Sequence, residues 1–256
     1  MDDNAWIPAY FDQMSSWAEQ RPWPRNDEQA ASVERLTGPG AKDVLELGCG
    51  EGITAVAMAA LGHRVTAVDL SPVRIGIARR RAEAAEGPQP TFLQGDFLTV
   101  APDSGPFDCV VCFNCFGTGT DAEQRRVLRR VADEWLRPGG RAVIDVYGPW
   151  RWAASAGKTT RGRHGVELVN YNDFDPVNGR WLDRWWPVGE PEKAVTQYGR
   201  AYTPADFALL VDGTGLTVER AELDGEPLDL AAEHDAASPL WQAWEYRVVL
   251  RHERSE

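Results

Sequence analysis

The sequence predicts a doubly wound α/β domain with a mostly parallel, seven-stranded sheet covered by helices on both faces. Three observations predict it. Apolar runs of strand length alternate with helical segments over the first two thirds of the chain. A glycine-rich turn follows the first apolar run. The 256 residues are 43% hydrophobic and 10% aromatic, which is enough apolar material for one large core.

The first five strands are expected at residues 43–47, 64–68, 91–94, 107–113 and 141–147. Segments of helical composition lie between them at 51–61, 71–86 and 121–136. Ser71 and Pro72 are typical of a helix start, Asp121 is expected to cap the last of these helices, and Pro138-Gly139-Gly140 is expected to end it. Because helices separate successive strands, the connections cross over and the strands run parallel.

Two helical segments, 4–20 and 26–36, precede the first strand. In the first, Trp6, Ile7, Tyr10, Phe11, Met14 and Trp17 form one apolar stripe at helical spacing. Both segments are expected to cover the open edge of the glycine-rich turn. We therefore assign residues 1–39 to an N-terminal helical cap.

The pattern changes after residue 147. Residues 153–162 are mostly small and are expected to form a mobile connection. Alternating segments at 166–175 and 180–188 flank an Asn178-Gly179 hairpin signal, and 194–202 supplies a third strand. Thr203 and Pro204 then start a helix, and 216–223 and 241–250 are the two closing strands. The core is thus expected at 40–149 and 203–256, with 150–202 as an inserted antiparallel β cover for the substrate.

Charge and hydropathy exclude several partner classes. With 39 acids against 27 bases the net charge is −12, so a nucleic acid is not expected as partner. No apolar run approaches the roughly 20 residues that span a bilayer, so no membrane partner is expected either, and we expect a cytoplasmic protein, monomeric or homodimeric.

Four cysteines are too few for a disulfide scaffold. Cys109, Cys112 and Cys115 form a C-x-x-C-x-x-C run, but the segment 107–113 is expected to be a buried strand, where residues three apart point to opposite faces, so no metal site is predicted.

The turn after the first strand carries the functional signal. Gly48, Gly50 and Gly52 allow the backbone to approach a ligand closely and lead into a helix N-terminus, which favours an anionic group. Asp69 ends the next strand, nineteen residues past Gly50, where an acid can accept both hydroxyls of a ribose. Loop and acid together predict an adenosine ligand.

Two departures argue against a nicotinamide dinucleotide. The position three after the second glycine, where that fingerprint needs a third glycine, is Ile53. Glu46 lies inside the first strand, where its charge would repel a pyrophosphate but could hold an ammonium group. An amino-acid head group suits this loop better, and a nicotinamide oxidoreductase is the last of the readings considered.

At this point the sequence resembles the class I S-adenosylmethionine-dependent methyltransferases of Rossmann-like fold. The matching segments are the Glu46-Leu-Gly-Cys-Gly-Glu-Gly52 run, Asp69, Gly95-Asp96-Phe97, the strand beginning at Phe107, and Leu136 to Ile144. The resemblance covers roughly residues 40 to 148 and implies S-adenosylmethionine as cofactor and S-adenosylhomocysteine as product. Gly48, Cys49 and Gly50 would pass beneath the methionine portion, Glu46 would orient its amino group, and Asp69 would bind the ribose.

The resemblance assigns the remaining site residues in the same way. Asp96 would meet the adenine amino group, with Phe97 supplying a backbone N–H and Leu70 an apolar face. Asn114 would lie near the methionine head group and face the methyl, as a catalytic and cofactor-binding residue. Apart from the resemblance, Tyr10, Phe11 and Trp6 of the N-terminal helix are expected to close the other side of the site as a lid, with Tyr10 as a cofactor contact.

Methyl transfer from a sulfonium is an in-line displacement, so alignment and desolvation are the protein's main task. His164 and His234 are the candidate bases if the acceptor must lose a proton. The segment after the fourth strand, from Asn114 to Thr118, lacks the Asn/Asp-Pro-Pro-aromatic run of members that methylate nucleobases or glutamine, and no Asp-Asn pair of metal-dependent members follows the fifth strand. Catalysis without a metal is expected.

Tryptophans gather in or beside the insertion, at positions 150, 152, 181, 185 and 186. They favour an aromatic or hydrophobic small-molecule acceptor, or they pack the insertion onto the sheet. The leading function is methyl transfer to an oxygen, nitrogen or carbon of a small, specialised metabolite. The alternatives keep the same fold and cofactor for decarboxylation, hydroxylation or cyclisation, or for noncatalytic binding.

Overall fold

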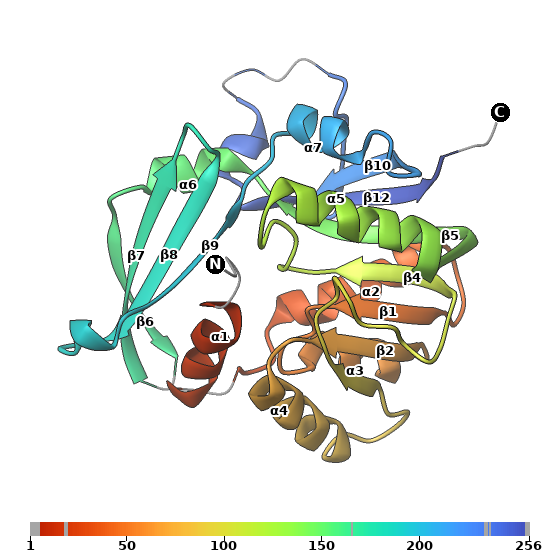
Figure 1. Ribbon diagram of the computed structural model, residues 1–256, viewed down its shortest axis with the longest axis horizontal. Helices are drawn as coiled ribbons and strands as arrows, with labels where there is room; N and C mark the ends of the chain where they lie inside the picture. Colours follow the sequence, from red (N-terminus) through yellow and green to blue (C-terminus); the bar gives the residue numbers. More distant parts are fainter. Residues whose placement is uncertain (1–5, 18–19, 165, 233–234, 236, 254–256) are drawn as a thin grey trace.

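The computed structural model describes residues 6–17, 20–164, 166–232, 235 and 237–253. Its large sheet has the order β11-β10-β12-β5-β4-β1-β2-β3 (Figure 1). The parallel strands are β1 (Asp43–Leu47), β2 (Arg64–Asp69), β3 (Thr91–Gln94), β4 (Phe107–Cys112) and β5 (Leu136–Tyr147). They are followed by the antiparallel β12 (Glu245–His252), β10 (Leu216–Leu223) and β11 (Glu226–Leu228). The predicted doubly wound sheet is confirmed, with β11 as a short additional edge strand.

Helices cover both faces, as expected. Val33, Met58 and Ile75 belong to one buried apolar layer, under α2 (Pro24–Thr37), α3 (Ile53–Ala60) and α4 (Pro72–Glu83). The other layer lies under α5 (Asp121–Arg130), its π-helical continuation η1 (Val131–Trp135) and α7 (Pro204–Val211), and it includes Leu128 and Phe207. Because both faces are covered, β1 and β2 are buried over nearly their whole length.

The helix-start signals are confirmed with one exception. The Ser71 hydroxyl accepts the Arg74 N–H at 3.0 Å, and Thr203 caps α7 in the same manner. For α5, however, the cap is Thr120, whose hydroxyl accepts the Glu123 N–H, and the expectation that Asp121 caps this helix is wrong. Asp121 is the first helical residue, and its carboxylate instead binds side chains from the segment before α7.

Two further boundaries differ from expectation. The Pro138-Gly139-Gly140 run lies inside β5 rather than in a turn after the helix, because Leu136 already pairs with Phe107. The mobile connection expected at 153–162 is wrong, since α6 (Pro149–Ser155) and β6 (Thr159–His164) occupy most of it. Trp152 anchors α6 by stacking on Trp181, with 4.7 Å between ring centroids.

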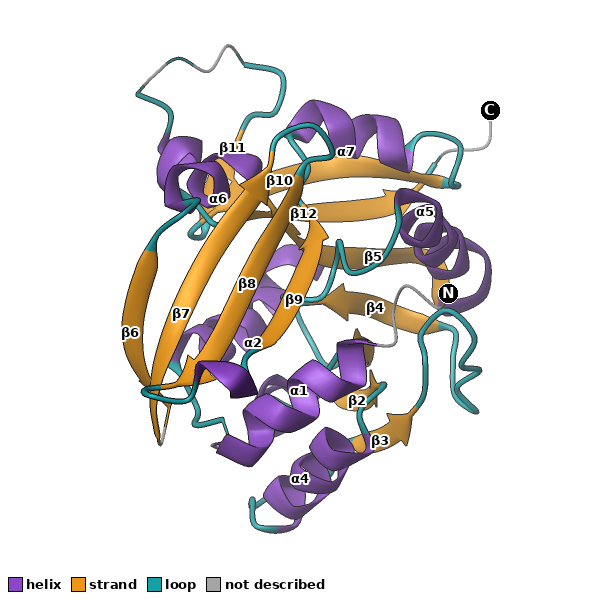
Figure 2. Cartoon of the chain, turned by 60° about the vertical axis from the view of Figure 1, so that its left-hand side comes forward, coloured by secondary structure: helices purple, strands orange, loops and turns teal. Residues whose placement is uncertain are grey.

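The inserted segment forms an antiparallel sheet of order β6-β7-β8-β9, whose other strands are β7 (Val166–Asp175), β8 (Arg180–Pro187) and β9 (Val195–Arg200). Short 3₁₀ turns lie at η2 (Pro191–Lys193) and η3 (Pro239–Gln242). Figure 2 shows this sheet beside the large sheet, with α1 (Trp6–Trp17) between β9 and α4. None of the described helices has the length and apolar character required for a bilayer span.

Candidate functional site

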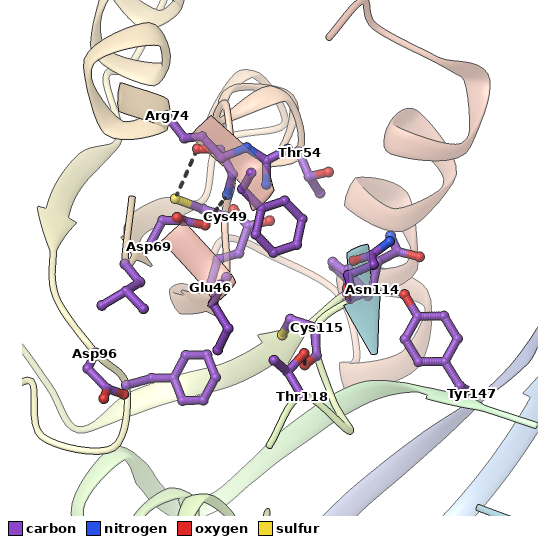
Figure 3. A pocket seen from close by; sticks show the side chains of 18 of the residues that line it. Glu46, Cys49, Thr54, Asp69, Arg74, Asp96, Asn114, Cys115, Thr118 and Tyr147 are labelled. Carbon is purple, nitrogen blue, oxygen red and sulfur yellow. Dashed lines mark hydrogen bonds between the residues drawn. The ribbon is translucent and has the colours of Figure 1, made fainter. Parts of the chain in front are cut away.

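A cleft of about 1260 Å³, including its open mouth, lies at the carboxyl ends of β1, β2 and β4. Crevices outside the carboxyl ends of parallel strands are where open α/β sheets bind ligands. Figure 3 shows the polar side chains around the cavity, among them Glu46, Asp69, Arg74, Asn114 and Tyr147. Two residues of α1, Ile7 and Phe11, form part of its wall.

The glycine loop has the conformation that its sequence predicts. Gly48, Gly50 and Gly52 have φ angles of 68°, 56° and 75°, a region in which side chains are strained. A Cβ on Gly48 would also lie 2.7 Å from Cβ of Cys115, and one on Gly52 would lie 2.7 Å from Cβ of Ala78. The loop therefore needs glycine for both conformation and space, and it leaves its backbone open to the cleft.

Asp69 fastens this loop to the end of β2. One carboxylate oxygen accepts the Gly50 N–H at 2.8 Å and the other accepts the Ser71 N–H at 2.9 Å. The side chain is buried but lines the cleft. Since each carboxylate oxygen can accept more than one hydrogen bond, Asp69 can shape the loop and still bind ligand hydroxyls.

Glu46 is a buried acid without a partner. Its side chain lines the cleft, only 3% of its surface is exposed, and Oε2 has no hydrogen bond among the described residues. Burial, followed by the nearby charge of Asp69, raises the pKa of Glu46 to about 8. A buried carboxyl group in this state is poised to pair with a ligand cation.

The far end of the cleft is built by the turn after β4. Asn114 has a φ of 57° and lines the cleft, and its carbonyl oxygen accepts the Tyr147 hydroxyl at 3.2 Å. Tyr147 packs edge-on against Trp181 of β8, with 5.1 Å between ring centroids. Gln197 of β9 completes this aromatic and amide-lined end.

A disulfide between Cys112 and Cys115 closes the same turn. Cys109 and Cys112 point to opposite faces of β4, as expected, since they belong to different apolar layers. Cys115 lies in the turn beyond the end of β4 at Cys112, where it can reach Cys112. The chain reverses through the left-handed Asn114, which brings the two sulfur atoms together. Among the described residues no cluster of three or more potential metal ligands is found.

The structure brings most of the sequence-predicted site residues together. Those that line the cleft are Glu46, Gly48, Cys49, Gly50, Asp69, Leu70, Asp96, Phe97 and Asn114. Asp96 also shapes its own turn by accepting the Leu98 N–H at 2.7 Å.

Tyr10 is placed differently. Its side chain is 4% exposed and faces the charge of Asp183, while its neighbours Ile7 and Phe11 on α1 line the cleft. Burial, then the Asp183 charge, raises the pKa of Tyr10.

The described cleft does not test the two candidate histidine bases. The backbone of His164 ends β6, the strand of the small sheet farthest from β9 in the sheet order, and its side chain is not among those described. His234 lies outside the described residues. Their catalytic role stays a prediction.

Sequence reasoning missed Arg74, which also lines the cleft. Its side chain is 7% exposed, and its guanidinium carbon lies 4.5 Å from the ring centroid of Phe11. Its position in the first turn of α4, five residues past Asp69, has no spacing signal of its own. Only the folded structure shows that Arg74 faces the cleft.

Comparisons with known proteins agree with this geometry. Residues 44–140 match the family model described as a methyltransferase domain. A putative methyltransferase of Geobacillus is 35% identical over 115 residues, which are 44% of this chain and 45% of the relative. The cypemycin N-terminal methyltransferase of Streptomyces is 33% identical over 45% of this chain and 46% of its own length. The chain thus spans less than half the length of these curated relatives.

Solved structures match over nearly the whole chain. The CcbJ methyltransferase of Streptomyces caelestis has a TM-score of 0.76 at 22% identity, with 96% of this chain and 98% of that chain covered. CalS10, an amino pentose methyltransferase of Micromonospora echinaspora solved with S-adenosylmethionine, has a TM-score of 0.63 at 21% identity. The match covers 96% of this chain and 95% of CalS10. The glycopeptide N-methyltransferase MtfA, also solved with this cofactor, has a TM-score of 0.60 at 21% identity. The match covers 89% of this chain and 94% of MtfA. At these identities the likeness shows the fold.

Proposed function

We propose that this chain, which carries a class I S-adenosylmethionine-dependent methyltransferase domain, methylates an amine nitrogen of a small molecule. The observation that carries the proposal is the pairing of an open glycine loop with two buried acids, Glu46 and Asp69, in one cleft. That arrangement has the charge and shape for a nucleoside with a cationic amino-acid head.

The residues present fit this cofactor. Glu46 has an unpaired carboxyl oxygen for the ammonium group, and Asp69 has free acceptor capacity for the ribose hydroxyls. Gly48 leaves room where a Cβ would collide with Cys115. Asp96 and Phe97 flank the part of the cleft assigned to adenine. When bound, the cofactor supplies an electrophilic methyl group on a sulfonium.

The chain's own residues then orient the acceptor and exclude water. Asn114, Tyr147, Trp181 and Gln197 surround the far end of the cleft, where aromatic faces and amide groups can hold a small acceptor. Ile7 and Phe11 of α1 cover the other side and limit access of solvent. Metal-independent transfer by in-line displacement remains part of this proposal.

The chemistry of methyl transfer and the names of similar proteins favour an amine acceptor. A neutral amine attacks with its own lone pair and gives up a proton to solvent after the methyl group has moved, so it needs no strong base. An alcohol does need a base. Three of the similar proteins have names that specify an amino sugar, a glycopeptide nitrogen or a peptide N-terminus.

Matched acceptor pairs test the proposal. The protein is incubated with methyl-labelled S-adenosylmethionine and with small molecules that differ only in carrying an amine or a hydroxyl at one position, such as amino sugars and their parent sugars. We expect label transfer to members of the amine set alone. Transfer to the hydroxyl partners, or label that leaves the cofactor without reaching any acceptor, would contradict an amine methyltransferase.

Variants of the two candidate histidines test whether either one acts as a general base. With an amine acceptor, His164→Ala and His234→Ala should leave both turnover and S-adenosylhomocysteine binding unchanged. A variant that lowers kcat more than tenfold while binding is retained would identify that histidine as a base. The acceptor would then be a group that must lose a proton during attack, such as a hydroxyl, and not an amine.

A further inference from the structure

Arg74 is a buried cation for which the described part of the chain supplies no counter-ion. Only 7% of its surface is exposed, and its guanidinium has no hydrogen-bond or ion-pair partner among the described residues. Its Nε is fully buried and unpaired, and the remaining contact is the face of Phe11. Burial of an unpaired charge is unfavourable, and a single aromatic face offsets only part of that cost. A guanidinium held in this way is best explained by an anionic ligand.

The position of Arg74 specifies where the anion would lie. The side chain lines the same cleft as the glycine loop, and its Nη1 is 3.2 Å from the point where a Cβ on Gly50 would be. Gly50 belongs to the loop assigned to the methionine portion of the cofactor. Figure 3 shows Arg74 near Cys49 on this side of the cavity, away from Tyr147. The unpaired guanidinium therefore faces the head-group region, not the acceptor end.

Charges around the cleft support the same assignment. Four acids line it, Glu46, Asp69, Asp96 and Glu123, and Arg74 is the one cationic side chain of the described lining. S-adenosylmethionine carries two positive groups, its sulfonium and its ammonium, and a single negative group, its α-carboxylate. The acids suit the positive groups, and the lone cation suits the carboxylate.

Resting on the proposed function, we propose that Arg74 binds the α-carboxylate of the cofactor's methionine portion. The planar guanidinium can donate two parallel hydrogen bonds to a carboxylate, which a lysine ammonium cannot match. The guanidinium carbon lies over the ring of Phe11, 4.5 Å from its centroid, so the aromatic contact leaves the N–H groups available to a carboxylate. Because Phe11 belongs to α1, the same contact brings the cap helix onto the bound head group.

The test uses two ligands that differ by one group. S-adenosylhomocysteine carries the α-carboxylate, and S-adenosylthiopropylamine is the same molecule without it but with the amine retained. Dissociation constants for both are measured by calorimetry with the wild-type chain, Arg74→Met, Arg74→Lys and the control Arg80→Met. Arg80 is exposed on the same helix and does not line the cleft. Thermal unfolding of every variant shows whether it is folded.

We expect Arg74→Met to weaken S-adenosylhomocysteine binding by roughly 10- to 100-fold and the decarboxylated ligand by less than about twofold. The affinity of Arg74→Lys for S-adenosylhomocysteine should lie between those of the wild type and Arg74→Met. The affinity of Arg80→Met should equal that of the wild type. Equal losses for the two ligands, or no loss for either, would overturn the carboxylate assignment while leaving the proposed function intact. Absence of measurable binding of either ligand to the folded wild-type chain would instead overturn the proposed function and this inference with it.

Discussion

Glu46 shows how one residue can favour binding and oppose stability. Its folded-state pKa, raised to about 8 by burial and by Asp69, exceeds the ordinary value of 4.5. Between these pH values the folded chain holds a proton that the unfolded chain has lost, so the free energy of unfolding should decrease as pH rises through this window. The cost of the buried carboxylate would be recovered when a ligand cation pairs with it.

The variant Glu46→Gln separates these two effects. The wild-type melting temperature should fall between about pH 4.5 and pH 8 as Glu46 ionises. The amide of the variant cannot ionise, so without ligand its melting temperature should fall less over this range. At pH 8 the variant should therefore be more stable than the wild type. Binding of S-adenosylhomocysteine at pH 8 should weaken by roughly tenfold or more, since a charge-assisted hydrogen bond is lost. Scanning calorimetry across pH with and without ligand measures both. Identical pH profiles for the two proteins would show that Glu46 is not the titrating group.

Asp69 has two tasks that one carboxylate performs together. It accepts backbone N–H groups from Gly50 and Ser71 and presents its remaining lone pairs to the cleft. We expect Asp69→Ala to weaken S-adenosylhomocysteine binding at least roughly 100-fold, because the loop and the ribose lose an acceptor at once. Asp108→Asn is a suitable control, since Asp108 also accepts a backbone N–H, from Asp43, but does not line the cleft. Equal affinity of the Asp69 variant and the control for S-adenosylhomocysteine would show that Asp69 does not contribute to binding.

At the scale of elements, Asp183 joins the strands of the inserted sheet and lies beside α1. Its carboxylate accepts side-chain N–H groups from Asn172 at 3.0 Å and from Trp185 and Gln197 at 2.8 Å, and it also binds Asn170. These donors come from β7, β8 and β9, and α1 packs on β9. A single buried acid thus holds the strands on which α1 packs and positions Gln197, which lines the cleft.

Removal of this acceptor should loosen these strands and α1. Asp183→Ala leaves several buried donors unpaired, and we expect the free energy of unfolding to fall by roughly 3 kcal/mol. Hydrogen exchange should rise in β8, β9 and α1, but not in β1 or β4. Asp173→Ala, at the partly exposed neighbour of Asn172, is the matched control and should cost less than about 1 kcal/mol. A uniform rise in exchange over the whole chain would contradict a role confined to these elements.

Local patterns in the sequence predict the elements but not their side-chain contacts. The strands β1 to β5 and the glycine loop follow from apolar runs, helix-start residues and φ requirements, all of which act over a few residues. The strand β11 could have been found too, because Asp224-Gly225 is a typical two-residue hairpin turn with positive φ at both positions. Arg74, Asp183 and the Cys112–Cys115 pair could not, since their roles depend on contacts that only the folded chain creates.

At the scale of the whole molecule, a buried ionic cluster joins the N-terminal α2 to the last strands of the sheet. Arg247 of β12 lies 2.7 Å from Asp145 of β5, 3.0 Å from Glu28 of α2 and 3.2 Å from Glu222 of β10. Arg35 of α2 binds Glu222 as well. Because α2 also contributes Asn26 and Gln29 to the cleft, this cluster connects the stability of the distal strands to the shape of the site.

Arg247→Met should be strongly destabilising. The exposed fractions of the side chains of Asp145 and Glu222 are 2% and 7%. Loss of their common cation leaves Asp145 with Arg25 at 3.6 Å and Glu222 with Arg35, so both buried carboxylates are less well compensated, and we expect a cost of about 3 kcal/mol. Arg64→Met breaks an ion pair with Asp43 in which the arginine is 82% exposed, and it should cost less than about 1 kcal/mol. Denaturant unfolding of both variants gives the comparison.

Acid should act on the same cluster in the wild type. Burial alone would raise the pKa of Glu222, but the hydrogen bond from Arg35 and the charges of Arg35 and Arg247 lower it below its ordinary value of 4.5. The stabilisation is therefore complete above about pH 4.5 and is lost as pH falls through the lower folded-state value. In Arg247→Met part of this favourable charge is absent, so its free energy of unfolding should depend less on pH over that range. Parallel acid profiles for the variant and the wild type would show that Arg247 does not lower the pKa of Glu222.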